Sequence, residues 1–205
     1  MDAEAWNERY AAEALVWSAE PNRFVISELG GLAPGRALDL AAGEGRNAIW
    51  LAGRGWRVTA VDFSDVAIGK GRKLARRRGV TVDWLTTDLR SYRPEPAGFD
   101  LVLAAYLHLP PTDLGVVLEA ATGALAPGGV LLVIGHDATN LGGGVGGPQD
   151  PELLYTPESI AAALVGLRID RAVRAARPVA TRTGLREAID TVVRAHRPVG
   201  ALDGR

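Results

Sequence analysis

Apolar runs of strand length alternate along much of the chain with stretches in which apolar residues recur at helical spacing. This alternation is typical of β-α-β units, and runs rich in Val, Leu and Ile indicate parallel strands that are buried on both faces. The pattern therefore predicts an α/β fold with five parallel strands, at Arg36–Ala41, Arg57–Val61, Val80–Thr86, Phe99–Ala104 and Val130–Gly135.

Three helices are expected between these strands, and the residues at their ends support the assignment. The expected helices are Arg46–Arg54, Asp65–Arg78 and Asp113–Ala126. Ser64 and Thr112 stand where a side chain can cap the second and the third helix. Pro127-Gly128-Gly129 predicts the end of the third helix.

The pattern changes after the fifth strand. Residues 142–148 are dominated by glycine and predict an irregular loop. Thr156-Pro157-Glu158 supplies a cap, a first-turn proline and a first-turn acid for a short helix that runs through Val165. We expect the chain to close with an antiparallel strand pair connected at Thr183-Gly184. The two strands are β-branched and rich in Arg, at Arg168–Val179 and Arg186–Arg197.

The composition fits one globular domain. With 205 residues, 47% of them hydrophobic, the chain can bury a core of its own, and it contains no internal repeat or linker. The absence of cysteine excludes disulfides and thiol chemistry, and the cytoplasm is the simplest expected location. Apolar stretches are too short for a membrane span, and the three histidines lie far apart in sequence, so neither a membrane nor a metal is expected.

The charge of the chain bears on its partners. A formal net charge of -1 gives no overall attraction to phosphate, so a small-molecule partner is favoured and a nucleic acid is not expected. The basic run from Lys70 to Arg78 is interpreted as a solvated helix face, with an RNA-binding surface as the alternative. The sequence carries no signal for an oligomeric state.

A glycine turn between the first strand and the first helix is the most informative segment. Gly43 and Gly45 permit close backbone approach, and the helix that follows presents free N–H groups. Asp39 at the strand tip can attract an ammonium group, which a pyrophosphate-binding loop would not need. The turn therefore predicts a ligand site, and the alternative is a plain turn into a helix.

Two further acids follow the next two strands. Asp62 ends the second strand at nearly the spacing from the glycine turn at which an acid binds ribose hydroxyls. Asp88 follows the third strand and can accept a hydrogen bond from an adenine amine. Each acid taken alone fits a capping or turn role equally well, but three acids at successive strand tips together indicate a nucleoside ligand.

The segment Asp39-Leu40-Ala41-Ala42-Gly43-Glu44-Gly45 resembles the first motif of the class I S-adenosylmethionine-dependent methyltransferases. The resemblance implies a Rossmann-like fold with a doubly wound, mostly parallel seven-stranded sheet, and S-adenosylmethionine as the cofactor. It places the first motif at the methionine moiety, Asp62 at the ribose and Asp88-Leu89 at the adenine, with Phe63 and Ala104 among the other cofactor-binding residues. Ala41 departs from the family pattern, which has a glycine there, so the turn must tolerate a Cβ.

Gly43–Ala52 and Val61–Ser64 resemble the small-molecule branch that contains tellurite-resistance and thiopurine-type methyltransferases. Upstream residues 6–10 and 17–23 are similar to the amino-terminal lid of that branch. The resemblance implies one domain over 1–205, divided into a helical lid (1–34), a cofactor-binding core (35–136), and a glycine loop with closing strands (137–205). It also implies that Arg9, Tyr10 and Arg46 meet the methionine end, whereas packing of an amphipathic helix on the sheet is the alternative.

The loop after the fourth strand faces the expected position of the transferred methyl group. Tyr106 and His108 are candidate acceptor-site and catalytic residues, because an imidazole can take a proton near neutral pH. Lining the cofactor is the alternative for this position. His136-Asp137 is a second possible proton acceptor, or else a hydrogen-bonded turn.

Two other functions compete with methyl transfer. Gly43-Glu44-Gly45-Arg46-Asn47-Ala48 also fits the dinucleotide fingerprint, so an NAD(P)-dependent oxidoreductase is the enzymatic alternative. Asp39 argues against it, because its charge would face the pyrophosphate. A non-catalytic S-adenosylmethionine-binding module is the other alternative. We expect in-line displacement on the cofactor methyl group, driven by alignment of the reactants and exclusion of water.

Overall fold

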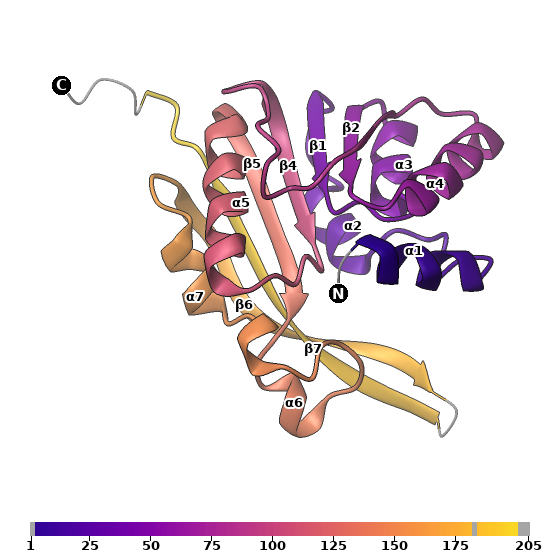
Figure 1. Ribbon diagram of the computed structural model, residues 1–205. Helices are drawn as coiled ribbons and strands as arrows, with labels where there is room; N and C mark the ends of the chain where they lie inside the picture. Colours follow the sequence, from indigo (N-terminus) through magenta and orange to yellow (C-terminus); the bar gives the residue numbers. More distant parts are fainter. Residues whose placement is uncertain (1–2, 182–183, 201–205) are drawn as a thin grey trace.

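A seven-stranded sheet in the order β3-β2-β1-β4-β5-β7-β6 forms the centre of the molecule (Figure 1). The structure is a computed structural model that describes residues 3–181 and 184–200. Strands β1 to β5 are parallel, whereas β7 is antiparallel to both β5 and β6. This order confirms the expected doubly wound sheet with an antiparallel closing pair. The strands are β1 Arg36–Leu40, β2 Arg57–Asp62, β3 Asp83–Thr86, β4 Phe99–Ala105, β5 Leu125–His136, β6 Arg168–Thr181 and β7 Gly184–His196.

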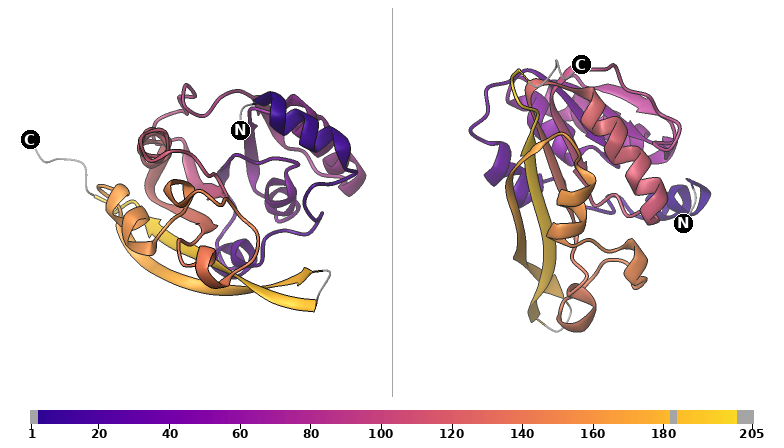
Figure 2. Two further views of the ribbon diagram at one scale, coloured as in Figure 1. Left: turned by 60° about the horizontal axis from the view of Figure 1, so that its bottom comes forward. Right: turned by 90° about the vertical axis from the view of Figure 1, so that its left-hand side faces the viewer.

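Helices cover both faces of the sheet, and each face has its own apolar core (Figure 2). One core joins α2 and α3 to the sheet, and the other joins α5 and α7 to the opposite face. Helix α4 packs beside α3, and α1 packs on α4. The helices are α1 Ala3–Ala12, α2 Arg23–Leu29, α3 Arg46–Gly53, α4 Asp65–Arg78, α5 Pro111–Ala124, α6 Asn140–Gly143 and α7 Pro157–Ala163, with a 3-10 turn at Pro151–Leu153.

Side-chain caps fix the start of two of the predicted helices. Ser64 Oγ accepts a hydrogen bond from Ala67 N at 3.0 Å and so caps α4. Thr156 and Ser159 form a reciprocal capping box at the start of α7. Because these side chains satisfy amides that the helix leaves free, their type and position could be predicted from sequence.

The assignments around α5 are wrong in two respects. Thr112 does not cap this helix, because α5 begins at Pro111 and places Thr112 inside its first turn. The helix ends at Ala124, and Pro127-Gly128-Gly129 lies within β5. The cause is long-range pairing that local propensity does not reveal: Gly128 N donates to Arg197 O at 2.8 Å, and Arg197 N donates to Gly129 O at 2.9 Å.

Other boundaries differ less. Strand β3 is shorter than expected and begins at Asp83. The glycine-rich segment opens with the single turn of α6, after which it is irregular. The β6–β7 hairpin projects beyond the rest of the sheet (Figure 1). Its connection was predicted at Thr183-Gly184, and Thr183 lies outside the described residues. Within 3–181 and 184–200, no helix is long and apolar enough to cross a membrane.

Candidate active site at the carboxyl edge of the sheet

The candidate residues gather at the carboxyl ends of the parallel strands. From β1 the strand order runs outward through β2 and β3 on one side and through β4 and β5 on the other, while all five strands stay parallel. Open α/β sheets bind ligands outside the carboxyl ends of the strands at such a switch point. In Figure 1 the arrowheads of β4 and β5 point toward this edge, and α1 lies along it. The site therefore has one half at the ends of β1 to β3 and another at the ends of β4 to β7.

Asp39 is the buried acid of the first half. Its side chain is only 1% exposed, and its Oδ2 has no hydrogen-bond partner among the described residues. Burial raises its pKa to about 7, against a hydrogen bond from the Ala48 amide and the charge of Arg46, which lower it. An unpartnered buried carboxylate oxygen is costly, and a bound cation would satisfy it.

The glycine turn adopts left-handed backbone at Ala41 (φ 57°), Gly43 (φ 55°) and Gly45 (φ 77°). Ala41 therefore carries a Cβ in a conformation that favours glycine, as the departure from the family motif predicts. A Cβ at Gly45 would lie 2.2 Å from the Trp84 ring, so this glycine permits packing of the indole. A Cβ at Gly43 would lie 2.8 Å from the Tyr10 hydroxyl.

Asp62 joins the glycine turn to the start of α4. It is 5% exposed, and its two oxygens accept hydrogen bonds from Gly43 N at 2.8 Å and Ser64 N at 2.9 Å. Burial raises its pKa, and these amides oppose the shift. Asp62 thus holds the turn in place, and its contact with ribose stays a prediction. Phe63 beside it is half-buried.

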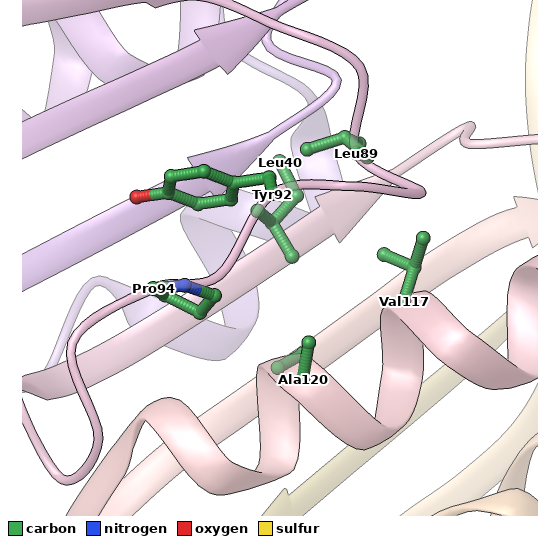
Figure 3. A pocket seen from close by; sticks show the side chains of 7 residues that line it. Leu40, Leu89, Tyr92, Pro94, Val117 and Ala120 are labelled. Carbon is green, nitrogen blue, oxygen red and sulfur yellow. The ribbon is translucent and has the colours of Figure 1, made fainter.

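The residues predicted at the adenine have different surroundings. Asp88 is partly exposed and binds the Arg90 guanidinium, which lowers the pKa of Asp88. Leu89 is buried and lines an apolar pocket between the β3–β4 connection and α5, which is too narrow to hold a water molecule (Figure 3). The other lining residues are Leu40, Tyr92, Pro94, Val117, Ala120 and Ala121. Ala104 is buried in the core on the same face of the sheet.

Glu44 is a residue whose role sequence reasoning missed. Its carboxylate is buried and accepts hydrogen bonds from Val16 N and Trp17 N, both at 3.1 Å. Lys70 Nζ lies 3.1 Å from the same carboxylate and also binds the Glu13 carbonyl at 2.6 Å. The acid between the two motif glycines thus fastens the amino-terminal segment over the turn.

The aromatic residues of this segment pack against one another. Tyr10 is 4% exposed, and burial raises its pKa to about 12. Trp17 Nε1 donates to the Tyr10 hydroxyl at 3.4 Å. The Arg9 guanidinium lies over the Trp6 and Trp17 rings, 5.1 Å and 5.4 Å from their centroids. Tyr10 therefore lies at the glycine turn, whereas Arg9 is held by indole rings.

Tyr106 begins the second half of the site in strained backbone. Its φ of 60° is unusual for a bulky residue, and such strain concentrates at functional sites. The Tyr106 hydroxyl donates to Asp190 Oδ2 at 2.9 Å and accepts from Asn22 Nδ2 at 3.0 Å. Arg46, at the start of α3, is close enough to Tyr106 and Arg177 for their charges to influence its pKa, which burial lowers.

His108 lies deeper than the sequence suggests. Its Nδ1 is 2.7 Å from the Leu153 carbonyl, so this nitrogen carries the proton and Nε2 carries the lone pair. His136 N donates to that Nε2 at 3.4 Å. Burial lowers the pKa of His108 to about 4, which makes it a weak base at neutral pH. Its catalytic role stays a prediction.

His136 and Asp137 separate into two environments. Asp137 accepts hydrogen bonds from the hydroxyls of Thr139 and Thr191 at 2.6 Å and 2.7 Å, which confirms the hydrogen-bonded turn. His136 instead faces Asp190, its register partner on the neighbouring strand β7. Sequence reasoning missed Asp190, although a lone acid in the apolar second half of its strand was a usable signal.

Comparison with known proteins identifies the fold and its core. The family described as methyltransferase domain matches residues 37–129, the segment that carries Asp39, the glycine turn and Asp62. This match supports the resemblance of residues 37–129 to the core of the class I S-adenosylmethionine-dependent methyltransferases. The oxidoreductase alternative receives no support from this match. Membership in the tellurite-resistance and thiopurine branch stays a prediction.

Two curated relatives of this chain are named for different kinds of acceptor. Ubiquinone biosynthesis O-methyltransferase of Paramagnetospirillum magneticum (strain ATCC 700264 / AMB-1) is 35% identical over 97 residues, which cover 46% of this chain and 38% of the relative. The tRNA 5-carboxymethoxyuridine methyltransferase of Escherichia coli (strain K12) is 32% identical over 52% of this chain and 42% of its own. The chain matches less than half the length of each.

Solved structures share the whole architecture of this chain. A structure described as conversion of a disulfide bond into a thioacetal group during echinomycin biosynthesis has a TM-score of 0.79 at 21% identity, covering 98% of this chain and 93% of its own. N-methyltransferase NodS of Bradyrhizobium japonicum WM9, in complex with S-adenosyl-L-homocysteine, has a TM-score of 0.71 at 21% identity, covering 97% and 100%. These likenesses concern the fold.

Proposed function

We propose that this protein transfers the methyl group of S-adenosylmethionine to a small-molecule acceptor by in-line displacement. The observation that carries the proposal is the buried Asp39 carboxylate, whose Oδ2 has no partner among the described residues. A cationic ammonium group satisfies that oxygen, and the cofactor of this family carries one. When bound, S-adenosylmethionine supplies an electrophilic methyl group on a positively charged sulfur.

The residues of the first half would hold the cofactor at several points. Asp39, Arg46 and the backbone of the glycine turn would bind the methionine end, with Tyr10 beside the turn and Arg9 in the segment above it. Asp62 and Phe63 would meet the ribose. Asp88 and Leu89 would border the adenine. Ala104 and the backbone at Ala41, Gly43 and Gly45 would line the rest of the cofactor.

Rate enhancement would come from alignment of the reactants and removal of water. Glu44 and Lys70 fasten residues 10–17 over the glycine turn, which supports a lid role for the segment 1–34 and a cofactor-binding role for 35–136. Such a lid would exclude water from the bound cofactor and help to align the acceptor with it. The glycine loop and closing strands, 137–205, complete the acceptor side of the one domain.

A small-molecule acceptor is favoured over RNA by the contacts of α4. Its basic run is partly occupied within the molecule, because Lys70 binds Glu44, Arg72 donates to the Trp84 carbonyl, and Arg78 pairs with Glu20. These contacts leave a smaller free basic face than the sequence suggests. The absence of cysteine supports a reducing location, and we propose the cytoplasm.

The test is calorimetric titration of S-adenosylmethionine into the wild type and Asp39→Asn. We expect the substitution to raise Kd by at least about tenfold, because a charge-assisted contact is lost. Asp83→Asn is the matched control, since Asp83 is an exposed acid at the opposite end of β3, and its Kd should stay within about twofold of the wild type.

The pH dependence of this titration is equally specific. The pKa of Asp39 is raised to about 7, so its carboxyl is protonated below that pH and must lose the proton to bind an ammonium group. The wild-type Kd should therefore rise as the pH falls from 8 to 6, by about tenfold per pH unit at most. Titration of the ligand's own amine affects the wild type and Asp39→Asn equally. If Kd depends on pH in the same way for both proteins, Asp39 does not bind the ammonium group.

Formation of S-adenosylhomocysteine separates an enzyme from the non-catalytic binding module. A screen of hydroxyl, amine and thiol acceptors with chromatographic detection of this product should reveal turnover. Binding of the cofactor without turnover on any acceptor would favour the binding module.

A further inference from the structure

Asp190 is the centre of the second half of the site and is completely buried. Its Oδ2 accepts hydrogen bonds from the Tyr106 hydroxyl at 2.9 Å and from Arg177 Nε at 2.8 Å. Its Oδ1 has no aligned hydrogen-bond partner among the described residues, and it lies 3.3 Å from His136 Nδ1. One oxygen of this carboxylate is therefore engaged, whereas the other faces an imidazole nitrogen that is also unpartnered.

The carboxylate determines the protonation of His136. An Nδ1 that faces a carboxylate oxygen carries the proton, so the lone pair of the neutral ring lies on Nε2. Burial lowers the pKa of His136, while the charge of Asp190 opposes that shift and the charge of Arg177 adds to it. The other titratable groups that face the ring are Tyr106 and His108, with ring centroids 5.2 Å and 5.5 Å away.

We propose that His136 is the catalytic base of this methyltransferase, that Asp190 is its positioning residue, and that the acceptor carries a phenolic hydroxyl. The inference rests on the proposed function. A base is needed because an un-ionised hydroxyl is a poor nucleophile, whereas a thiolate needs none. The aromatic rings of Tyr106 and His108 beside His136 suit a flat aromatic acceptor.

The acceptor oxygen gives its proton to His136 Nε2 and forms a bond to the methyl carbon. The bond from that carbon to sulfur breaks, and its electron pair stays on sulfur, which becomes the neutral thioether of S-adenosylhomocysteine. The imidazolium that forms faces the free Oδ1 of Asp190, which stabilises its charge, and it later loses the proton to water.

His136 is better placed for this step than His108. Both rings are half-buried, but the Nδ1 of His108 donates to the Leu153 carbonyl, whereas the Nδ1 of His136 faces Asp190 Oδ1 at 3.3 Å. The charge of Asp190 also raises the pKa of His108, but less than burial lowers it. The glycine-rich loop covers the other edge of His136: a Cβ at Gly147 would lie 2.6 Å from the ring and 3.0 Å from Nε2. A side chain at this position would clash with the ring next to its lone pair.

The test compares His136→Gln and Asp190→Asn with the wild type, using two phenols as acceptors. 4-Methylphenol is un-ionised at neutral pH, whereas pentafluorophenol is ionised there and needs no base. At pH 7, His136→Gln should lower kcat/KM for 4-methylphenol by about 100-fold or more, and for pentafluorophenol by less than about fivefold. Asp190→Asn should lower the rate on 4-methylphenol by at least about tenfold.

His196→Gln is the matched control, because His196 forms a second histidine–aspartate pair, 2.7 Å from Asp170, at the far end of β7. It should keep both rates within about twofold of the wild type. The wild-type rate on 4-methylphenol should rise with pH through the pKa of His136 and then level off, since only the neutral ring accepts a proton. His136→Gln should lose that rise. A purely structural role for His136 would lower both rates alike.

A spectroscopic measurement keeps the inference testable if a variant misfolds. Nitrogen-15 spectra of the wild-type histidines at pH 7 should show His136 as the Nδ1–H tautomer, and the Nε2–H tautomer would overturn the proposal. It would also be overturned by equal losses on both phenols, or by a wild type that binds S-adenosylmethionine but methylates neither phenol. A wild type that fails to bind the cofactor would instead refute the proposed function.

Discussion

The two halves of the site are built in different ways. In the first half, Asp62 holds the glycine turn through backbone amides, and the residues involved span fewer than thirty positions of sequence. In the second half, Tyr106, Arg177 and Asp190 meet through side chains of three separate strands or their ends, and Tyr106 lies 84 positions from Asp190. The first half is a local structure that a motif can encode, whereas the second depends on the closing of the sheet.

Replacing Asp62 should have the largest effect on the first half. In Asp62→Ala the amides of Gly43 and Ser64 lose their partner while they stay buried, which should lower the free energy of unfolding by about 2–4 kcal/mol. Urea denaturation measures this loss. Asp62→Asn keeps one acceptor oxygen and should lose about half as much; equal stability of Asp62→Ala and the wild type would show that these hydrogen bonds do not hold the turn.

Replacing Tyr106 should have the next largest effect and tests the second half. Tyr106→Phe removes the donor to Asp190 and the acceptor for Asn22 while it keeps the ring. We expect a loss of about 1–2 kcal/mol in urea denaturation, because one bond is to a buried carboxylate. Tyr92→Phe, at a hydroxyl on the other face of the sheet, is the control and should change stability by less than about 0.5 kcal/mol.

Ala41→Gly should have a smaller and opposite effect. Ala41 has a φ of 57°, and glycine adopts this conformation without the clash of a Cβ. We expect a gain of about 0.5–1 kcal/mol, reduced by the greater entropy of glycine in the unfolded chain. Thermal unfolding measures the change, and Ala42→Gly is the control, since Ala42 has no positive φ and should lose stability.

Asp88→Ala should have the smallest effect on folding. Its ion pair with Arg90 is solvent-exposed, so its removal should change the free energy of unfolding by less than about 0.5 kcal/mol. If Asp88 accepts a hydrogen bond from the adenine, Kd for S-adenosylmethionine should still rise by about fivefold. A Kd equal to that of the wild type would remove Asp88 from the cofactor site and restrict the first half to Asp39, Asp62 and the glycine turn.

The contrast between local and long-range structure also explains what could be predicted from sequence. The parallel strands, the cap at Ser64 and the capping box at Thr156 follow from local pattern, and they agree with the structure. The predicted end of α5 was wrong because Gly128 and Gly129 form backbone hydrogen bonds with Arg197, a contact that local propensity does not encode.

The site shows the same limit. Asp39 and Asp62 could be selected as candidates because strand tips and glycine turns have a recognisable spacing. Glu44 was missed because its partners, the amides of Val16 and Trp17, lie in a segment without regular structure. Asp190 was missed because β7 lies beside β5 only once the sheet has assembled, and only then does Asp190 reach the Tyr106 hydroxyl.

Calorimetric titration of the wild type with S-adenosylmethionine, S-adenosylhomocysteine, NAD and NADP in one buffer tests the central claim most directly. The buried Asp39 carboxylate, whose Oδ2 has no partner among the described residues, predicts micromolar binding of the first two ligands and no measurable binding of either dinucleotide. Binding of a dinucleotide alone would contradict the account, because its pyrophosphate would then lie at a turn whose buried acid requires a cation.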